Sequence, residues 1–458
     1  MRRRWGVVGL VTVLGCATSI HGRRDDGGRP RDVVATETLV ATDCVDGAAC
    51  AERHVPPPCD RGRRPDARPS VACSALVGDR SAALHSIGTG NLTALVWNGS
   101  DYAFTWSALE SSSPVLFGLY FGRADRDGEL IPGSVHRIFA SDRHQTRGAL
   151  AVGADGYGLA WLDLPNDGLT VGMRAHFARL GFDGALIAGS ERLLSTQHPP
   201  HQGVAIAYSA PLRQWAVAWQ GQVALGGGNV ESHAYLSRID ASCAIVEPNA
   251  ALLDALRSTT DPDFAPSLVW ARDRYAIVLS EYVAIPNARV SIAEIDPTTA
   301  AVTRRIVLRE GGRPLRATLA TDGTMYGAAW MQLGLDAPTS NAVWFRRAAV
   351  GGDALGEAVA LAGARNSGEP AVLFDGDTFR VAFSLGDERA GGVWRARISR
   401  DGAVVGTPGL RFAGAPPFSA FPLLASDGCN DAIGWTAIAG SGGQSATVRL
   451  HLRATAAD

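Results

Sequence analysis

One short motif recurs seven times along the chain, at intervals of 51 to 60 residues. Every copy except the third begins with a turn that contains Gly, Asp or Asn, and all continue into a run of aromatic and small residues. Five of the seven copies end on Trp; the final residues are Trp106, Trp161, Trp219, Leu279, Trp330, Phe383 and Trp435. A motif repeated at one period indicates a fold built by stacking copies of a single supersecondary unit.

The residues inside the motif alternate with a period of two. In the first copy Tyr102, Phe104 and Trp106 alternate with Ala103 and Thr105, and the second and third copies follow the same pattern. A period of two after a turn is typical of a β-strand, whereas a helix repeats every 3.6 residues. The motif therefore predicts the second strand of a β-hairpin.

This predicted strand has large residues on one face and Ala or Gly on the other, and Arg380 is the one charged residue that interrupts the pattern. A strand with two uncharged faces is buried on both, so each sheet should place its bulky face on the small face of its neighbour. An aromatic binding stripe is the alternative, but recurrence in every copy favours packing. Replacing one such Trp by Ala should cost about 3 to 5 kcal/mol.

Each of the first six copies is followed by a second turn signal, 21 to 26 residues after the aromatic or apolar residue that opens the strand. These signals lie at Asp127-Gly128, Asp183-Gly184, Asp240, Asp296-Pro297, Gly351-Gly352 and Asp401-Gly402. Two hairpins per repeat give four strands. Four-stranded antiparallel units in a ring form a β-propeller, so the sequence predicts an all-β, seven-bladed β-propeller over residues 73–458.

The seventh copy lacks a fourth strand, because the chain ends in "VRLHLRATAAD". The segment 75–86, "ALVGDRSAALHS", is similar to residues 185–195, which carry the fourth-strand pattern. We therefore expect the N-terminal strand to complete the last blade and close the ring, which removes exposed sheet edges. In this register Cys73 and Cys429 lie on the same face, and a disulfide between them requires a Cα separation below about 7 Å.

The N-terminus, "MRRRWGVVGLVTVLGC", has the form of a secretion signal: a basic start and an apolar run too short to span a bilayer. Its end resembles the bacterial lipobox. The resemblance implies a signal peptide over residues 1–15 and lipidation of Cys16 as the N-terminus of the mature protein. Ala17 favours the outer membrane. An ordinary secreted protein cut nearby is the alternative.

Residues 16–72 are rich in Arg, Asp, Gly and Pro and predict a disordered tether. The tether holds Cys44, Cys50 and Cys59, and Cys243 lies in the repeat region. In an oxidising compartment these cysteines favour disulfides over metal binding, with the connectivity left open.

Chemical motifs are few. The chain has no Lys, which excludes P-loop and Schiff-base chemistry, and its net charge of −2 gives no reason to expect a nucleic-acid partner. His198 and His201, and the acidic turns at 125–129 and 375–379, are weak metal candidates. We therefore predict no catalytic residue, no metal and no cofactor.

The longer loops fall between second and third strands and between repeats, which places them on one face of the predicted ring. That face and the mouth of the central channel are the expected ligand side.

The lipobox and the seven repeats together resemble envelope lipoproteins of Gram-negative bacteria that carry a seven-bladed propeller. The resemblance covers residues 1–20 and 73–458 and concerns the architecture alone. Because the predicted scaffold is complete and carries no recognisable catalytic set, we predict a monomeric, membrane-anchored extracytoplasmic protein that binds a protein, peptide or glycan. A polysaccharide hydrolase or lyase is the alternative, and a structural part of an envelope assembly is a third. The sequence favours binding over catalysis but leaves the choice open.

Overall fold

The computed structural model describes residues 80–83, 90–112, 115–140, 144–164, 173–195, 200–226, 229–246, 251–258, 266–281, 288–333, 341–362, 367–385, 392–411, 419–428, 430–439 and 445–454. The chain divides into two units, Met1–Gly62 and Arg63–Asp458, and every described residue belongs to the second. These residues form strands and turns without a helix. Among them, no helix has the length and apolarity needed to cross a membrane.

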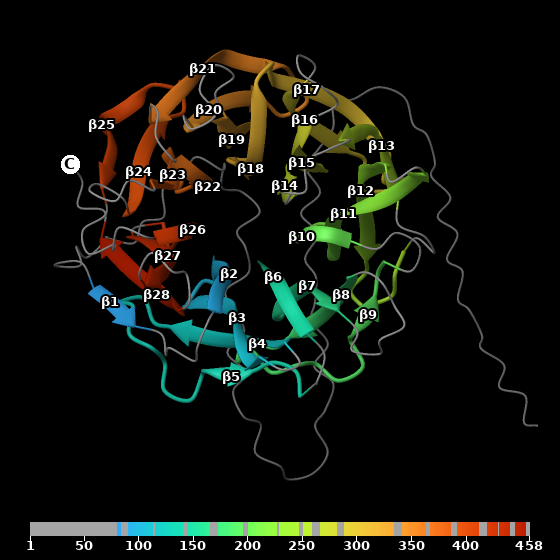
Figure 1. Cartoon of the computed structure of the whole chain (residues 1–458), viewed down its shortest axis with the longest axis vertical. Coiled ribbons are helices and arrows are strands. Elements are labelled where there is room, and N and C mark those ends of the chain that lie inside the picture. Colours follow the sequence, from blue (N-terminus) through green and yellow to red (C-terminus); the bar gives the residue numbers. More distant parts are fainter. Residues whose placement is uncertain are drawn as a thin grey trace, which may run out of the picture. The chain divides into compact units, whose positions relative to one another are not determined.

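The described strands form seven four-stranded antiparallel sheets, arranged around a common centre (Figure 1). The first strand of each sheet lies nearest the centre. These inner strands are β2 (Gly90–Trp97), β6 (His144–Val152), β10 (Pro200–Ser209), β14 (Ser267–Ala271), β18 (Arg313–Thr321), β22 (Ser367–Phe374) and β26 (Ser419–Ser426). The second strands are β3 (Tyr102–Ser112), β7 (Tyr157–Leu164), β11 (Gln214–Gly226), β15 (Arg274–Glu281), β19 (Met325–Leu333), β23 (Thr378–Leu385) and β27 (Asn430–Ala439).

The third and fourth strands follow outward in each sheet. The third strands are β4 (Val115–Ala124), β8 (Arg174–Leu180), β12 (Asn229–Ile239), β16 (Arg289–Ile295), β20 (Asn341–Ala349), β24 (Gly392–Ser399) and β28 (Ser445–Ala454). The outer strands are β5 (His136–Arg137), β9 (Arg192–Leu193), β13 (Ala251–Ser258), β17 (Val302–Glu310), β21 (Ala354–Ala362), β25 (Val404–Arg411) and β1 (Arg80–Ala83). All seven copies of the sequence motif thus end in second strands, as predicted.

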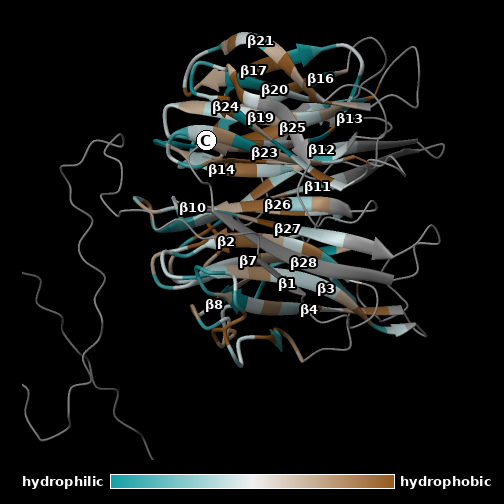
Figure 2. Cartoon of the chain, turned by 90° about the vertical axis from the view of Figure 1, so that its left-hand side faces the viewer, coloured by the Kyte–Doolittle hydropathy of each residue, from teal (hydrophilic) through white to brown (hydrophobic). Residues whose placement is uncertain are grey.

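The second strands are buried on both faces. In β7 every residue from Tyr157 to Asp163 is buried, although only alternate side chains are large. The Trp side chains at the ends of the motif, such as Trp161 and Trp219, are 0% exposed. Figure 2 shows the sheets side-on, stacked one on the next, with apolar residues along the strands.

Each sheet places its bulky face on the small face of its neighbour, as expected. A methyl group added at Gly158 of β7 would lie 2.5 Å from the ring of Trp215 in the next sheet. Gly327 of β19 faces Phe379 of the following sheet in the same way. The small residues of the motif are therefore required by the neighbouring ring, because side chains at these positions would overlap it.

The tyrosines that open the second strands connect neighbouring sheets. Asn98 Nδ2, in the first turn of one sheet, donates a hydrogen bond of 2.6 Å to the Tyr157 hydroxyl of the next. The Tyr326 hydroxyl donates to Glu294 Oε1 of the preceding sheet at 3.1 Å. Burial is the largest cause that raises the pKa of both tyrosines, so both hydroxyls stay protonated and available as donors.

The first and last sheets pack against each other. The backbone N–H of Leu92 donates to Thr436 Oγ1 at 3.2 Å, and Phe104 shares a core cluster with Ala425 and Ala432. Strand β1 pairs antiparallel with residues 449–452 of β28. The N-terminal strand therefore supplies the fourth strand of the last sheet, within the segment 75–86 that the sequence assigned to it.

Candidate functional site

Six of the seven inner strands carry a break in their pairing with the second strand, close to where the inner strand begins. In β6 the register shifts between Thr146 and Ala149, and in β18 between Leu315 and Thr318. The other four strands are β2, β10, β22 and β26. A β-bulge of this kind changes the direction in which a side chain points.

Three of these bulges hold a non-glycine residue in the left-handed backbone region. The φ angles are 57° at Arg147, 49° at Arg316 and 54° at Phe421, and Gly203 has 32° at the bulge of β10. This conformation costs a residue with a side chain about 1 to 2 kcal/mol. Observed strain of this sort points to positions where the side chain has a role that offsets the cost.

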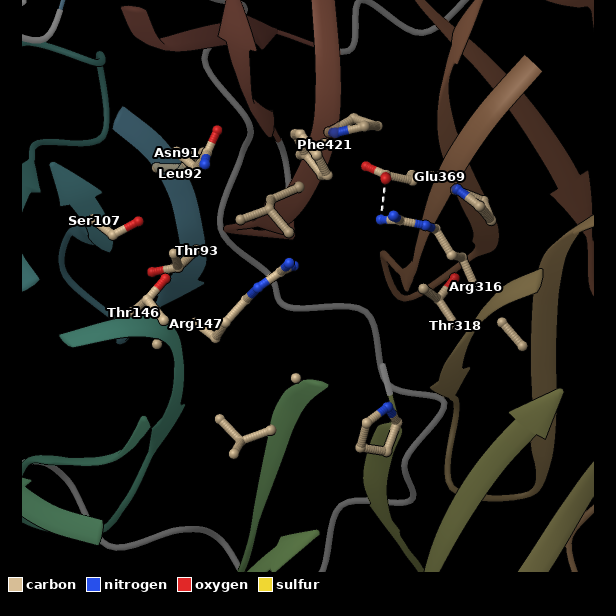
Figure 3. Close-up of a pocket in the computed structure, with 18 of the residues that line it drawn as sticks. Asn91, Leu92, Thr93, Ser107, Thr146, Arg147, Arg316, Thr318, Glu369 and Phe421 are labelled. Carbon is tan, nitrogen blue, oxygen red and sulfur yellow. Dashed lines mark ion pairs between the residues drawn. The ribbon is translucent and has the colours of Figure 1, made fainter. Parts of the chain in front are cut away.

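The bulges surround a central cavity of about 330 Å³ (Figure 3). Its lining takes residues from, or next to, the inner strand of every sheet. The lining residues are Asn91, Leu92, Thr93, Ser107, Phe117, Thr146, Arg147, Gly148, Gly203, Val204, Pro266, Arg316, Ala317, Thr318, Glu369, Pro370, Phe421, Pro422 and Leu423. The volume falls within the range of roughly 300 to 1,000 Å³ that small-molecule sites occupy.

The cavity lies toward one face of the ring. Its residues in β2 and β6, 91–93 and 146–148, come within the first few positions of strands that begin at Gly90 and His144. Inner strands begin where the links between sheets end. The cavity is therefore on the side of those links and of the loops between second and third strands, which is the side expected to hold the ligand.

One wall of the cavity carries an ion pair. Arg316 Nη1 of β18 contacts Glu369 Oε1 of β22, and the two side chains are 25% and 18% exposed (Figure 3). The Arg316 guanidinium also lies 5.7 Å from the centre of the Phe421 ring, a cation–π contact to the next sheet. Three adjacent sheets thus fix the position of this guanidinium.

Arg147 approaches the cavity from β6. It is exposed, and its guanidinium points into the space between the two walls (Figure 3). Among the described residues of the lining, Arg147 and Arg316 are cationic and Glu369 is anionic. The lining therefore carries one more guanidinium than carboxylate, which favours an anionic ligand.

Neutral polar groups lie around these charges. The buried Thr318 Oγ1 has no hydrogen-bond partner within the described part of the chain, and Thr93 Oγ1 lies 2.9 Å from Thr105 Oγ1. Asn91, Ser107 and Thr146 add further amide and hydroxyl groups (Figure 3). An unsatisfied buried hydroxyl costs free energy until a ligand or water completes it, so this lining suits a ligand with many hydroxyl groups.

The residues singled out from the sequence lie away from this cavity. Cys16, Cys73 and Cys429 are outside the described residues, so lipidation and the disulfide stay predictions. Cys243 is buried with a free thiol, which corrects the expectation that it joins a disulfide. Its thiol sits in the tight turn between β12 and β13, where the backbone at Cys243 has a φ of 67°.

The weak metal candidates behave as turn residues where they are described. Asp125 Oδ1 accepts backbone N–H groups of Asp127 and Glu129, and Asp375 Oδ1 does the same for its own turn. His198 is outside the described residues, and only the backbone of His201, in β10, is described. Within the described residues, no group of three or more His, Cys, Asp or Glu side chains could hold a metal ion.

Four cavity residues were not identified as site residues from the sequence: Arg147, Arg316, Glu369 and Phe421. A signal existed for three of them, because Glu369 and Phe421 each precede a Pro and Arg147 precedes a Gly inside a strand pattern. Pro and Gly within a strand often mark a bulge. The charge balance of the cavity had no such signal, since its members come from strands far apart in the chain.

The fold and cavity define a β-propeller with a polar central site. No family model and no curated protein matches the chain. Among solved structures, a protein of unknown function from Dyadobacter fermentans is 10% identical and covers 82% of this chain and 98% of its own, with a TM-score of 0.49. The hemagglutinin-neuraminidase ectodomain of parainfluenza virus 5 is 8% identical over 82% and 84% of the two chains, with a TM-score of 0.47. An ulvan lyase of a new polysaccharide lyase family is 8% identical over 81% and 95%, with a TM-score of 0.48.

Proposed function

We propose that the protein is a membrane-anchored extracytoplasmic binding protein that takes the end of a glycan into the central cavity. The observation that carries the proposal is the lining, in which hydroxyl and amide groups surround charged and aromatic side chains. Sugars present hydroxyl groups and apolar ring faces together, and this lining matches both. A folded protein partner needs about 1,000 Å² of contact surface, which a cavity of about 330 Å³ does not offer.

Binding is favoured over glycoside hydrolysis by the number of carboxylates. Hydrolysis of a glycosidic bond generally uses two carboxyl groups roughly 5 to 10 Å apart. Among the described residues of the lining, Glu369 is the one acid, and its carboxylate already pairs with Arg316. The alternative function, a polysaccharide hydrolase or lyase, predicts release of shortened sugars from a bound polysaccharide.

A glycan array probed with the mature chain tests the proposal. Thr318→Trp would fill the cavity from β18, and Asp377→Trp would place the same bulk on an exposed turn away from the lining. We expect bound glycans to be lost with Thr318→Trp and kept with Asp377→Trp. An array without bound glycans, or equal binding by both variants, would refute the proposal.

The membrane anchor is proposed from the N-terminal sequence. A lipid on Cys16 would hold the protein at the membrane, and residues 16–72 as a flexible coil would have an end-to-end distance on the order of 40 Å. We expect Cys16→Ala to move the protein from the detergent phase to the aqueous phase in a phase-separation assay. A protein that stays in the detergent phase after this change would contradict lipidation at Cys16.

A further inference from the structure

Arg147 and Arg316 occupy the same kind of bulge but have different surroundings. Arg316 pairs with Glu369 and lies near the Phe421 ring, so its charge is balanced within the lining. Arg147 is exposed on β6, and its guanidinium points into the cavity (Figure 3). The Arg147 guanidinium is therefore within reach of a ligand in the cavity.

The backbone at Arg147 has a conformation that disfavours any residue with a side chain. Its φ of 57° is a conformation that glycine adopts without a steric penalty, and Gly203 occupies the bulge of β10. An arginine at such a position carries a conformational cost that a glycine would not. This cost points to a role for the guanidinium itself.

The chemistry of that role follows from the shape of the guanidinium. Its planar fork of N–H donors matches the two oxygens of a carboxylate, and such charge-assisted pairs are stronger than neutral hydrogen bonds. The hydroxyl and amide groups of Thr93, Thr146 and Asn91 lie on the same side of the cavity as Arg147 (Figure 3). A ligand that contacts both the Arg147 guanidinium and these hydroxyl and amide groups carries a carboxylate next to hydroxyl groups.

We infer that the cavity recognises an acidic saccharide, such as a uronic acid at the end of a glycan, and that Arg147 binds its carboxylate. This inference rests on the proposed function and names the ligand class of the same site. Glu369 has a secondary part, because its carboxylate neutralises Arg316 and weakens the attraction of that wall for a second anion.

The first test compares charged and neutral forms of one sugar. Disaccharides of galacturonic and glucuronic acid and their methyl esters have the same rings, but the esters lack the negative charge. Titration calorimetry on the mature chain should show the acids binding about tenfold or more tightly than the esters, as charge-assisted hydrogen bonds imply. This difference should shrink as salt is added.

The second test uses variants with opposite expected signs. Arg147→Gly should weaken binding of the acid about tenfold or more while leaving the ester unchanged, and its thermal midpoint should not fall, because glycine relieves the strained φ. Arg147→Lys keeps the positive charge but lacks the planar fork of donors. Its affinity for the acid should lie between that of the unchanged chain and that of Arg147→Gly. Glu369→Gln should strengthen binding of the acid and not of the ester.

Arg213→Gly is the matched control, since Arg213 also has a positive φ, 49°, and is not part of the lining. Its affinity for both sugars should match that of the unchanged chain. Equal affinity for acid and ester would overturn the inference and leave the proposed glycan site standing. A loss of folding in Arg147→Gly would also overturn it, because Arg147 would then be structural. Failure of both sugars to bind, with other glycans bound on the array, would overturn the acidic ligand class, and failure of all glycans would remove the proposed function as well.

Discussion

The second strands and the inner strands differ in what is repeated from sheet to sheet. At the end of the motif in the second strands, the same type of residue recurs, and Trp161, Trp219 and Trp330 are all 0% exposed. At the bulges of the inner strands the backbone shape recurs while the residues differ. The residues at these bulges include Thr93, Arg147, Gly203, Arg316, Glu369 and Phe421.

The contrast separates the requirements of folding from those of binding. Every interface between sheets must fill the same space, so each blade supplies a large ring and a small partner, as with Trp215 and Gly158. The cavity is shared by all blades, and a ligand without sevenfold symmetry requires each blade to contribute something different. In a repeat protein of this type, uniform positions stabilise the fold and varied positions at a common bulge form the candidate site.

The largest expected effect is on the uniform positions. Trp161→Ala should lower the free energy of unfolding by about 3 to 5 kcal/mol, because it empties a packed interface between two sheets. Trp97→Ala, at a partly buried end of an inner strand, should cost less. Urea denaturation followed by circular dichroism measures both. A loss below about 1 kcal/mol for Trp161→Ala would show that the aromatic positions do not hold the sheets together.

The next effect concerns Arg380, a buried charge in the second strand β23. Arg380 of β23 contacts Asp375 and lies 3.5 Å from Asp431 in the next sheet. Burial, with a smaller repulsion from Asp375, raises the pKa of Asp431 to about 6, while Arg380 and Arg395 oppose the rise. Asp431 is therefore harder to ionise in the folded chain than in the unfolded chain.

A raised carboxyl pKa means that the stability from this group is greatest below its unfolded pKa and falls as pH rises toward 6. The shift from 3.8 to about 6 corresponds to about 3 kcal/mol, lost between about pH 4 and pH 6. Burial raises the pKa of Asp375, but backbone hydrogen bonds and Arg380 together outweigh it and lower the pKa, so the contribution of Asp375 is lost only below the ordinary range for Asp. The free energy of unfolding should fall as pH rises across this range for the unchanged chain. For Asp431→Asn it should change less with pH. Identical slopes would contradict the assignment.

A smaller effect is expected where the first and last sheets meet. Removing residues 1–83 deletes β1 and leaves the edge of β28 unpaired. Loss of the backbone hydrogen bonds between β1 and β28 should lower the free energy of unfolding by about 2 kcal/mol. The exposed strand edge should promote self-association. Thermal unfolding and light scattering during size-exclusion chromatography measure the two changes. A monomer of unchanged stability would show that β1 does not close the last sheet in solution.

The smallest effect is on the links between sheets near the first turns. Tyr157→Phe removes the hydroxyl that Asn98 contacts and should cost about 0.5 to 1.5 kcal/mol. A double-mutant cycle with Asn98→Ala isolates the pair. A coupling energy of zero would mean that packing of the Tyr157 aromatic ring, without its hydroxyl, aligns these two sheets.

The sequence was sufficient to predict the strands and their order. The alternation around Trp106 and the turn signals such as Asp183-Gly184 are local, and each is repeated, so errors in one copy are corrected by the others. The same reasoning predicted that the N-terminal strand pairs with the C-terminal strand, because the last copy of the repeat lacks a fourth strand of its own.

The site was not predictable to the same degree. Arg316 and Glu369 are 53 residues apart, and Arg147 is farther still, so no local pattern relates them. Their meeting depends on the ring bringing all inner strands to one centre and on bulges that turn the side chains inward. What could be predicted was the side of the ring, from loop length, and not the residues or their charge.

Hydrogen exchange of the full chain, with and without a saturating uronic-acid disaccharide, tests the central claim that the bulges form the binding site. Bulge amides lack regular ladder partners, so they should exchange readily until a ligand covers them. We predict slower exchange with ligand at residues 91–93, 146–148, 316–318, 369–370 and 421–423, and no change in the turns at 98–101 and 322–325. Protection confined to those turns, or none at the bulges, would contradict the account.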